Sequence, residues 1–193
     1  MAGKLLYTEG KTFERTDFLH AGIERGEYEN CTFSHCLLSK ANLSHFLFTE
    51  CTFKDCDLSM AVLTQTSFKE VVFKNCKLLG LHFDHCNPFL LSFTFEDCQL
   101  NLASFYRLKL VKTLFRNSSL KEVDFTGTDL SSSTFDNCDF AEATFNGSIL
   151  EKADLRSSYH YSIDPEINKI KKARFSLQGI RGLLDKYGII IEN

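Results

Sequence analysis

The sequence predicts a solenoid, a single domain built from short repeats that stack on one another. A large apolar residue recurs at every fifth position from Phe13 to Phe83, and again from Leu90 to Leu155 after a slip of two residues. A period of five fits neither an amphipathic helix, which repeats every 3.6 residues, nor an ordinary strand, which alternates every two. The 193 residues, 44% hydrophobic and 24% charged, are enough for one domain with a substantial core.

A second apolar position precedes each of these centres by two residues. It usually holds a small side chain, such as Cys31, Ala41 or Thr66, and exceptions such as Phe46 and Leu81 are still apolar. Both positions are therefore expected to point inward. The other three positions of each five are more often polar and should face water.

Several repeats fit the motif A(D/N)LxX, among them Ala41-Asn42-Leu43, Cys56-Asp57-Leu58 and Ala153-Asp154-Leu155. In this motif and in its five-residue spacing, the chain resembles the pentapeptide-repeat family over nearly its whole length. The resemblance implies an all-β protein: a right-handed quadrilateral β-helix with four pentapeptides in each square coil. About eight coils are expected, with a short C-terminal capping helix.

Such a fold stacks residues twenty positions apart on one face, and the residue types follow this order. After correction for the slip, one face carries a ladder of phenylalanines, which favours stacking of rings in successive coils. A second face reads Leu90, Leu110, Leu130 and Leu150. The phenylalanine ladder is the predicted structural core: Phe13, Phe33, Phe53, Phe73, Phe95, Phe115, Phe135 and Phe175.

The eight cysteines all fall at the small inward position of the repeat. Buried cysteine behaves as a small hydrophobic side chain, so a packing role is favoured, with redox or metal-binding roles as the alternatives. The N-terminus lacks the pattern of a signal peptide, which leads us to expect a cytoplasmic, reducing setting without disulfides.

Three segments are expected along the chain: an N-terminal cap or edge strand in residues 1–10, the β-helix in 11–175 with its slip near 86–89, and a C-terminal helix and strand in 176–193. Residues 176–188 show the pattern of a helix, with Ser176 as the N-cap.

The apolar residues of this C-terminal segment exceed what one end of a solenoid is expected to bury. A dimer interface is therefore predicted there, and a purely intramolecular cap is the alternative. The predicted interface residues are Leu177, Ile180, Leu183, Leu184, Tyr187, Ile189, Ile190 and Ile191.

The sequence contains no Gly-rich phosphate loop, nucleophile elbow or HExxH motif, so neither catalysis nor a cofactor is expected. The richest polar cluster is His82-Phe83-Asp84-His85-Cys86, beside the slip. We interpret it as a surface cluster; the alternative, a metal site, needs further ligands that the sequence does not identify. The slip is interpreted as a corner bulge or, alternatively, as a small loop that exposes Phe89 to a partner.

The C-terminal segment resembles that of the quinolone-resistance (Qnr-type) members of the family, through Ile163-Asp164-Pro165, Leu183-Leu184 and residues 187–191. This resemblance implies a homodimer formed through the C-terminus, which binds a type II topoisomerase (DNA gyrase or topoisomerase IV) as a mimic of B-DNA and modulates quinolone sensitivity. The chain departs from these relatives in its small loop and its weak net charge of −3. The alternative is a scaffold or adaptor with an unrelated protein partner.

Two neighbouring faces of the predicted rod carry an excess of acidic residues and form the candidate partner-binding surface. The net charge of −3 predicts neither direct binding of nucleic acid nor attraction to an anionic membrane. No apolar run approaches the ~20 residues that span a bilayer. The candidate acidic residues are Glu24, Asp84 and Asp124 on one face, and Asp17, Asp57 and Asp139 on the next.

Overall fold

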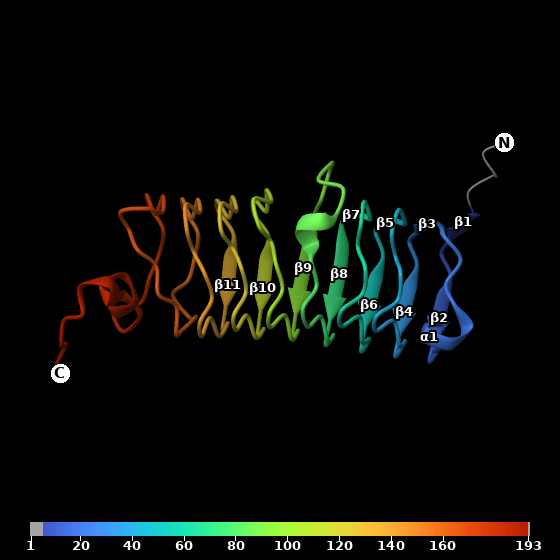
Figure 1. The fold of residues 1–193 in the computed structure, drawn as a ribbon, viewed down its shortest axis with the longest axis horizontal. Helices are drawn as coiled ribbons and strands as arrows, with labels where there is room; N and C mark the ends of the chain where they lie inside the picture. Colours follow the sequence, from blue (N-terminus) through green and yellow to red (C-terminus); the bar gives the residue numbers. More distant parts are fainter. Residues whose placement is uncertain (1–5, 193) are drawn as a thin grey trace.

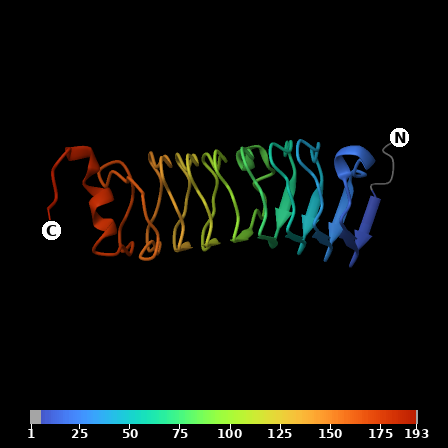
Figure 2. The same ribbon diagram turned by 90° about the horizontal axis from the view of Figure 1, so that it is seen from below.

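The chain forms a rod of stacked coils, with its first strand and its C-terminal helices at opposite ends (Figures 1 and 2). A computed structural model describes residues 6–192. Every strand pairs in parallel with the strand one coil away, and the coils make about seven turns of a β-solenoid. In the described residues, no helix is long and apolar enough to cross a membrane.

Two sides of the rod carry the regular strands. The four-stranded sheet contains β1 (Leu6–Glu9), β3 (Gly26–Glu29), β5 (Leu47–Thr49) and β7 (Ser67–Lys69). The seven-stranded sheet contains β2 (Thr12–Glu14), β4 (Thr32–Ser34), β6 (Thr52–Lys54), β8 (Val71–Lys74), β9 (Phe93–Glu96), β10 (Leu114–Arg116) and β11 (Thr134–Asp136). The helical segments are α1 (Phe18–Ala21) and the 3-10 helices η1 (Phe83–His85), η2 (Gly179–Leu183) and η3 (Asp185–Tyr187).

The predicted phenylalanine ladder forms the core of the seven-stranded sheet. The strand register places Phe13 beside Phe33 and continues ring by ring to Phe135. Neighbouring rings lie 4.6 to 5.5 Å apart between centroids and within 15° of parallel. Phe13 and Phe175, at the ends of the column, are only half-buried. Each such aromatic pair adds about 0.5–1.5 kcal/mol beyond the burial of its area.

The second inward position ties one coil to the coil below it. Here Cys76 donates its thiol hydrogen bond to the carbonyl of Phe53 at 3.3 Å, and Thr66 donates to Leu43 at 2.7 Å. Ser158 donates to Phe135 in the same way at 2.9 Å. All eight thiols are free and buried, so cysteine, serine and threonine serve here as small side chains that also donate to a buried carbonyl.

The five-residue spacing follows from a left-handed residue two positions after most of the apolar centres. His45, Gln65 and Arg107 have φ of 63°, 55° and 56°. At these corners the residue turns the chain, and its N–H donates to the next coil, as Gln65 does to the carbonyl of His85 at 2.8 Å. These inter-coil hydrogen bonds offset the cost of about 1–2 kcal/mol that a non-glycine residue pays in this conformation.

The structure corrects two sequence-based expectations in the solenoid. The rod makes about seven turns rather than eight, and beyond β11 the register continues through isolated bridges such as Asp154 with Arg174. Leu90 was expected to resume the inward series, but it is 58% exposed. Phe93, in register with Val71 at the small inward position, is buried, and its ring lies 5.5 Å from that of Phe68, whereas the inserted residues leave the rod as a loop.

The two ends of the rod have different structures. β1 is an edge strand of the four-stranded sheet and lies within the range 1–10, of which residues 1–5 lie outside the described part. At the other end, the predicted helix is a pair of short 3-10 helices, η2 and η3. Residues 189–191 form no strand with any residue in the range 6–192, which corrects the expected terminal strand.

Candidate interaction surfaces

The aspartates that precede the apolar centres shape the corners of the rod. Asp57, Asp124 and Asp139 each accept a hydrogen bond from the backbone N–H two residues further on, at 2.9, 2.8 and 3.2 Å. This is an Asx turn, in which the side chain replaces a backbone acceptor. The D/N position of the motif therefore has a structural role in addition to the partner contact predicted for these residues.

The predicted acidic surface is not a continuous stripe. Neighbouring coils place Asp17, Leu37, Asp57, Lys77, Gln99, Ser119 and Asp139 in one column, so each aspartate is separated from the next by other residues. On the adjoining face, Asp124 stacks between Ser104 and Thr144. Glu24 and Asp84 lie on that same face by the repeat register. The structure thus shows scattered carboxylates on these two faces.

Several of these carboxylates are also compensated by basic side chains. Asp17 caps α1 and contacts His20 Nδ1 at 2.7 Å, and this hydrogen bond lowers the pKa of Asp17. Asp139 lies 2.8 Å from His160 Nδ1 and 3.2 Å from Lys121 Nζ. Partial burial opposes ionisation of Asp139, but these hydrogen bonds and that of the Ala141 N–H lower its pKa. Their charge is therefore partly neutralised within the chain.

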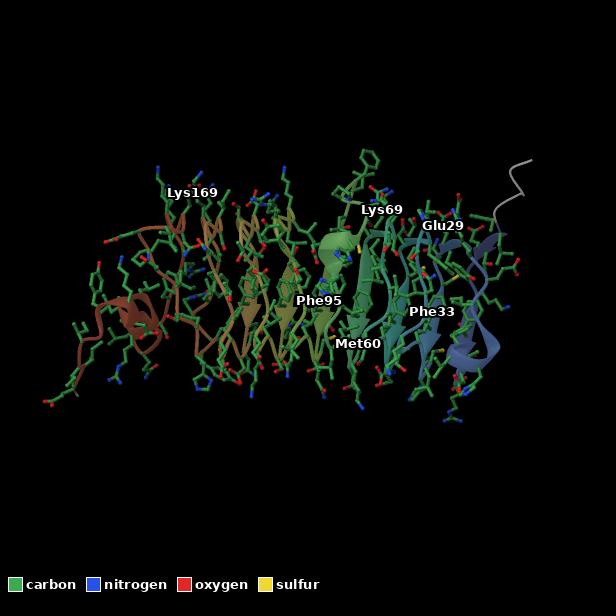
Figure 3. The ribbon with its side chains drawn as sticks, viewed as in Figure 1. Glu29, Phe33, Met60, Lys69, Phe95 and Lys169 are labelled. Carbon is green, nitrogen blue, oxygen red and sulfur yellow. The ribbon has the colours of Figure 1, made fainter. Side chains whose placement is uncertain are left out.

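A stronger charge pattern runs along the side that carries β1, β3, β5 and β7. Its N-terminal half is acidic and its C-terminal half is basic; Figure 3 shows Glu29, Lys69 and Lys169 along this edge. Tyr7 donates to Glu29 at 2.8 Å and to Glu9 at 3.2 Å, which holds two carboxylates together and raises the pKa of Tyr7. We call this side the polarised face. Its acidic residues are Glu9, Glu27, Glu29, Glu50 and Glu70, with Lys69 as the exception, and its basic residues are Lys109, Lys112, Lys152, Lys169, Lys171 and Lys172, with Asp129 and Glu151 as exceptions.

The slip forms a small projecting loop, residues 87–92, which stands out from the rod between η1 and β9 (Figure 1). Its two ends are held: Asn87 donates from its amide to Ser67 at 3.1 Å, and Ser92 Oγ accepts from the N–H of Glu70 at 2.7 Å. Between these anchors Phe89 is 73% exposed. The loop therefore presents an apolar tip, in agreement with the second interpretation of the slip.

The C-terminal cap packs closely on Tyr161. A Cβ atom at Gly179 would overlap the Tyr161 hydroxyl, and one at Gly182 would overlap its backbone carbonyl. Gly182 also accepts a hydrogen bond from the N–H of Ile163 at 2.8 Å. Glycine in the interior of a helix weakens the helix. In the structure Gly179 and Gly182 allow the cap to approach the last coil, and two short 3-10 helices replace an α-helix.

Side chains also anchor the cap. Ser176 Oγ accepts from the N–H of Gly179, the first residue of η2, at 3.0 Å, but the residue that directly precedes η2 is Gln178 rather than the predicted N-cap Ser176. Lys186 Nζ lies 2.8 Å from Asp164 and 2.6 Å from Glu166, and its hydrogen bonds lower the pKa of both carboxyls. The segment Ile163-Asp164-Pro165, which carried part of the resemblance to Qnr-type proteins, thus contacts the cap directly.

The predicted dimer residues fall into two groups. Leu183 and Leu184 are partly buried, and Leu183 packs against the core of the same chain. The other six remain exposed, and Leu177 and Ile190 are 88% and 89% exposed. The structure leaves a substantial apolar surface at this end of the rod, formed by Leu177, Ile180, Tyr187, Ile189, Ile190 and Ile191.

Comparison with known proteins identifies the repeats in two segments of the chain. Residues 29–65 match a family model of eight pentapeptide repeats, and residues 110–154 match a family model of nine. Both segments therefore consist of pentapeptide repeats. Both matches lie in regular coils, on either side of the slip, where the five-residue spacing is unbroken. No sequence among curated proteins matches the chain significantly.

Two solved structures are similar to this chain. A structure of QnrB1, a plasmid-mediated fluoroquinolone resistance protein, is 20% identical and covers 98% of this chain and 100% of its own, with a TM-score of 0.63. HetL, a pentapeptide-repeat protein involved in regulating heterocyst differentiation in the cyanobacterium Nostoc, is 16% identical. The match covers 90% of this chain and 86% of HetL, with a TM-score of 0.43. At 20% identity the likeness to QnrB1 concerns the fold alone, and the match extends over nearly the whole of both chains.

Proposed function

We propose that this pentapeptide-repeat protein is a non-enzymatic interaction module that binds a type II topoisomerase, DNA gyrase or topoisomerase IV, and thereby modulates sensitivity to quinolones. The observation that supports the proposal most strongly is the match over the whole chain to QnrB1, a fluoroquinolone resistance protein. The C-terminal cap, held by Asp164, Glu166 and Lys186, supports it further, because it uses the segment in which the sequence resembles Qnr-type proteins.

The polarised face is the surface we assign to this partner. A topoisomerase surface that holds DNA must be basic, because duplex DNA carries one negative charge per ~1.7 Å of its axis. The acidic half of the polarised face gathers five glutamates over the first coils and complements such a surface better than the scattered aspartates Asp17, Asp57, Asp84, Asp124 and Asp139 with Glu24. The acidic half thus acts as a local mimic of DNA, although the net charge of the chain is only −3.

The exposed apolar end supports a homodimer. Leu177 and Ile190 are almost fully exposed, and Ile190 lies in residues 189–191, which form no strand with any residue in the range 6–192. A second copy would cover these side chains through a two-fold interface. The full chain should sediment as a dimer, and replacement of Leu177 and Ile190 by glutamate should yield monomers. A wild-type chain that sediments as a monomer at micromolar concentration would contradict the dimer.

The topoisomerase proposal is tested by DNA supercoiling with purified gyrase, with and without a quinolone. The chain should inhibit supercoiling or protect it from the drug at micromolar concentration. The charge-reversed variant Glu27→Lys/Glu50→Lys should lose this effect. A matched control, Glu122→Lys/Glu142→Lys, reverses the same number of exposed carboxylates on another face and should behave as the wild type.

The second candidate function is a scaffold or adaptor with an unrelated protein partner. The projecting loop favours it, because Phe89 and Leu90 form an apolar tip that does not resemble DNA. This candidate becomes the better one if gyrase and topoisomerase IV are both indifferent to the wild-type chain, or if Glu27→Lys/Glu50→Lys and the control have equal activity. The cytoplasmic location remains a prediction under both functions.

A further inference from the structure

We propose that the turn His82–His85 binds one divalent transition-metal ion through His82, Asp84 and His85. The three side chains each offer a ligand atom, and these atoms all lie within 4.8 Å of one another. His82 Nδ1 is 3.3 Å from one oxygen of Asp84, and His85 Nε2 is 3.7 Å from the other. No other group of three such residues is found in the described part of the chain.

The local backbone brings the two histidines together. At the equivalent corners of the coils before and after, Gln65 and Arg107 have φ of 55° and 56°, and their N–H groups donate to the next coil. His85 breaks this rule: it belongs to the 3-10 helix η1, and its N–H donates instead to the carbonyl of His82 at 3.2 Å. The corner therefore folds back on itself just before the inserted loop.

This 3-10 turn accounts for the ring positions. In a 3-10 helix, side chains three residues apart eclipse each other. The imidazoles of His82 and His85 are three residues apart, and they lie 4.8 Å apart between centroids at an angle of 13°. Asp84 lies between them in sequence and contacts both. The regular corner that contains Asn42 and His45 differs from this turn, because His45 has the left-handed conformation usual at that position.

The chemistry of the three residues fits an ion that prefers nitrogen. Two imidazoles and one carboxylate suit Zn²⁺ and Ni²⁺, with ligand distances of about 2.0–2.2 Å. Both histidine side chains are more than half exposed, at 58% and 56%, so their rings are free to rotate toward a shared ion. Asp84 is 17% exposed and provides the more fixed ligand. Water would complete the coordination from the hollow beside Thr64, Gln65 and Tyr106.

The site is independent of the proposed topoisomerase partner. It lies at the base of the loop, because Cys86 and Asn87 follow His85 directly. An ion held by His82 and His85 would join the two sides of the corner from which the loop departs. The ligand class follows from imidazole and carboxylate chemistry alone, so the experiment uses metal ions as probes.

Isothermal titration of the full, untagged chain with ZnCl₂ and with NiCl₂ tests the proposal. We expect one ion per chain, and affinity at least about tenfold lower in His82→Ala and in His85→Ala. The control His160→Ala removes a histidine that also pairs with an aspartate, Asp139, but has no third ligand residue in the described chain. It should bind as the wild type does.

Cobalt distinguishes this site from the cysteines. The spectrum of the Co²⁺-loaded chain should show nitrogen and oxygen ligation without a thiolate-to-metal charge-transfer band, because all eight thiols are buried. The proposal is overturned if no ion binds at micromolar concentration, if the two histidine variants bind as the wild type does, or if the Co²⁺ spectrum shows thiolate ligation. Because both histidines are exposed, unchanged thermal unfolding of the variants will show that they fold.

Discussion

Phe53 and Phe89 have the same side chain, yet Phe53 is fully buried between two stacked rings and Phe89 is 73% exposed on the loop. Phe53 lies at the centre of a repeat, whereas Phe89 lies in the two-residue insertion that breaks the repeat. Register rather than residue type decides which side chain enters the core. The regular coils and their interruptions therefore have different roles: the coils supply stability, and the interruptions and outer faces supply surfaces for binding.

The largest expected effect comes from removing a rung of the ladder. Phe53→Ala should lower the free energy of unfolding by about 3–5 kcal/mol, because a cavity replaces a buried ring that contacts Phe33 and Phe73. Phe89→Ala should change it by less than about 0.5 kcal/mol. Urea-induced unfolding of both variants measures the difference, and similar losses in the two would refute the distinction between coil and loop.

Thiol reactivity probes the same interior. Burial raises the pKa of the Cys51 thiol from 9.0 to about 12, so the thiolate is scarce at pH 8 in the folded chain. Three pKa units correspond to on the order of 1,000-fold less thiolate. Ellman's reagent should therefore react at least 100-fold more slowly with folded than with urea-unfolded protein. Rapid reaction of several thiols in the folded chain would contradict the packing role.

The C-terminal interruption should be sensitive to a single methyl group. Gly182→Ala would place a Cβ against the backbone of Tyr161, and overpacking of this kind costs about 1–3 kcal/mol. We expect loss of protection from hydrogen exchange in the cap, with the central coils unchanged. Gln178→Ala, on the exposed surface next to η2, is the control and should leave the cap intact.

The repeat predicts that its small inward residues are interchangeable. Cys76 shares a column with Ser118 and Ser158, so Cys76→Ser should retain the donor to Phe53 and cost less than about 1 kcal/mol. Cys76→Ala leaves the carbonyl of Phe53 without that donor and should cost more, by about 1 kcal/mol. Thermal unfolding of the two variants decides whether the hydrogen bond or only the volume matters.

The smallest effect is expected at Tyr161. Its hydroxyl is buried without a hydrogen-bond partner. Tyr161→Phe removes an unsatisfied polar group while it keeps the ring, so the free energy of unfolding should be unchanged or rise by up to about 1 kcal/mol. A clear loss of stability would show that this hydroxyl makes a favourable contact under the cap.

The regular part of the fold was predictable because each repeat has the same task. Every fifth residue enters the core, so the spacing from Phe13 to Phe83 revealed both the solenoid and its ladder. The corner chemistry was less visible. Asp57 accepts a local hydrogen bond from the N–H of Ser59. The sequence alone does not distinguish an aspartate that closes a turn from one that contacts a partner.

The sequence located the two interruptions of the repeat, the loop and the C-terminal cap, but did not predict their structures. The slip between residues 86 and 89 was visible in the sequence, whereas the exposure of Leu90 depends on how the loop leaves the rod. In the same way the sequence did not reveal the contact of Gly179 and Gly182 with Tyr161, because this contact joins positions distant in sequence. The right-handed turn at His85 likewise has no counterpart in the repeat pattern.

The most direct test of the proposed function is a binding measurement between the full chain and DNA gyrase, with duplex DNA as competitor. If the acidic half of the polarised face mimics DNA, the chain should bind gyrase at micromolar concentration or tighter, and added duplex should displace it. Glu27→Lys/Glu50→Lys should bind at least about tenfold more weakly, a change of 1.4 kcal/mol. Absence of binding, or binding that duplex DNA leaves unchanged, would contradict the account.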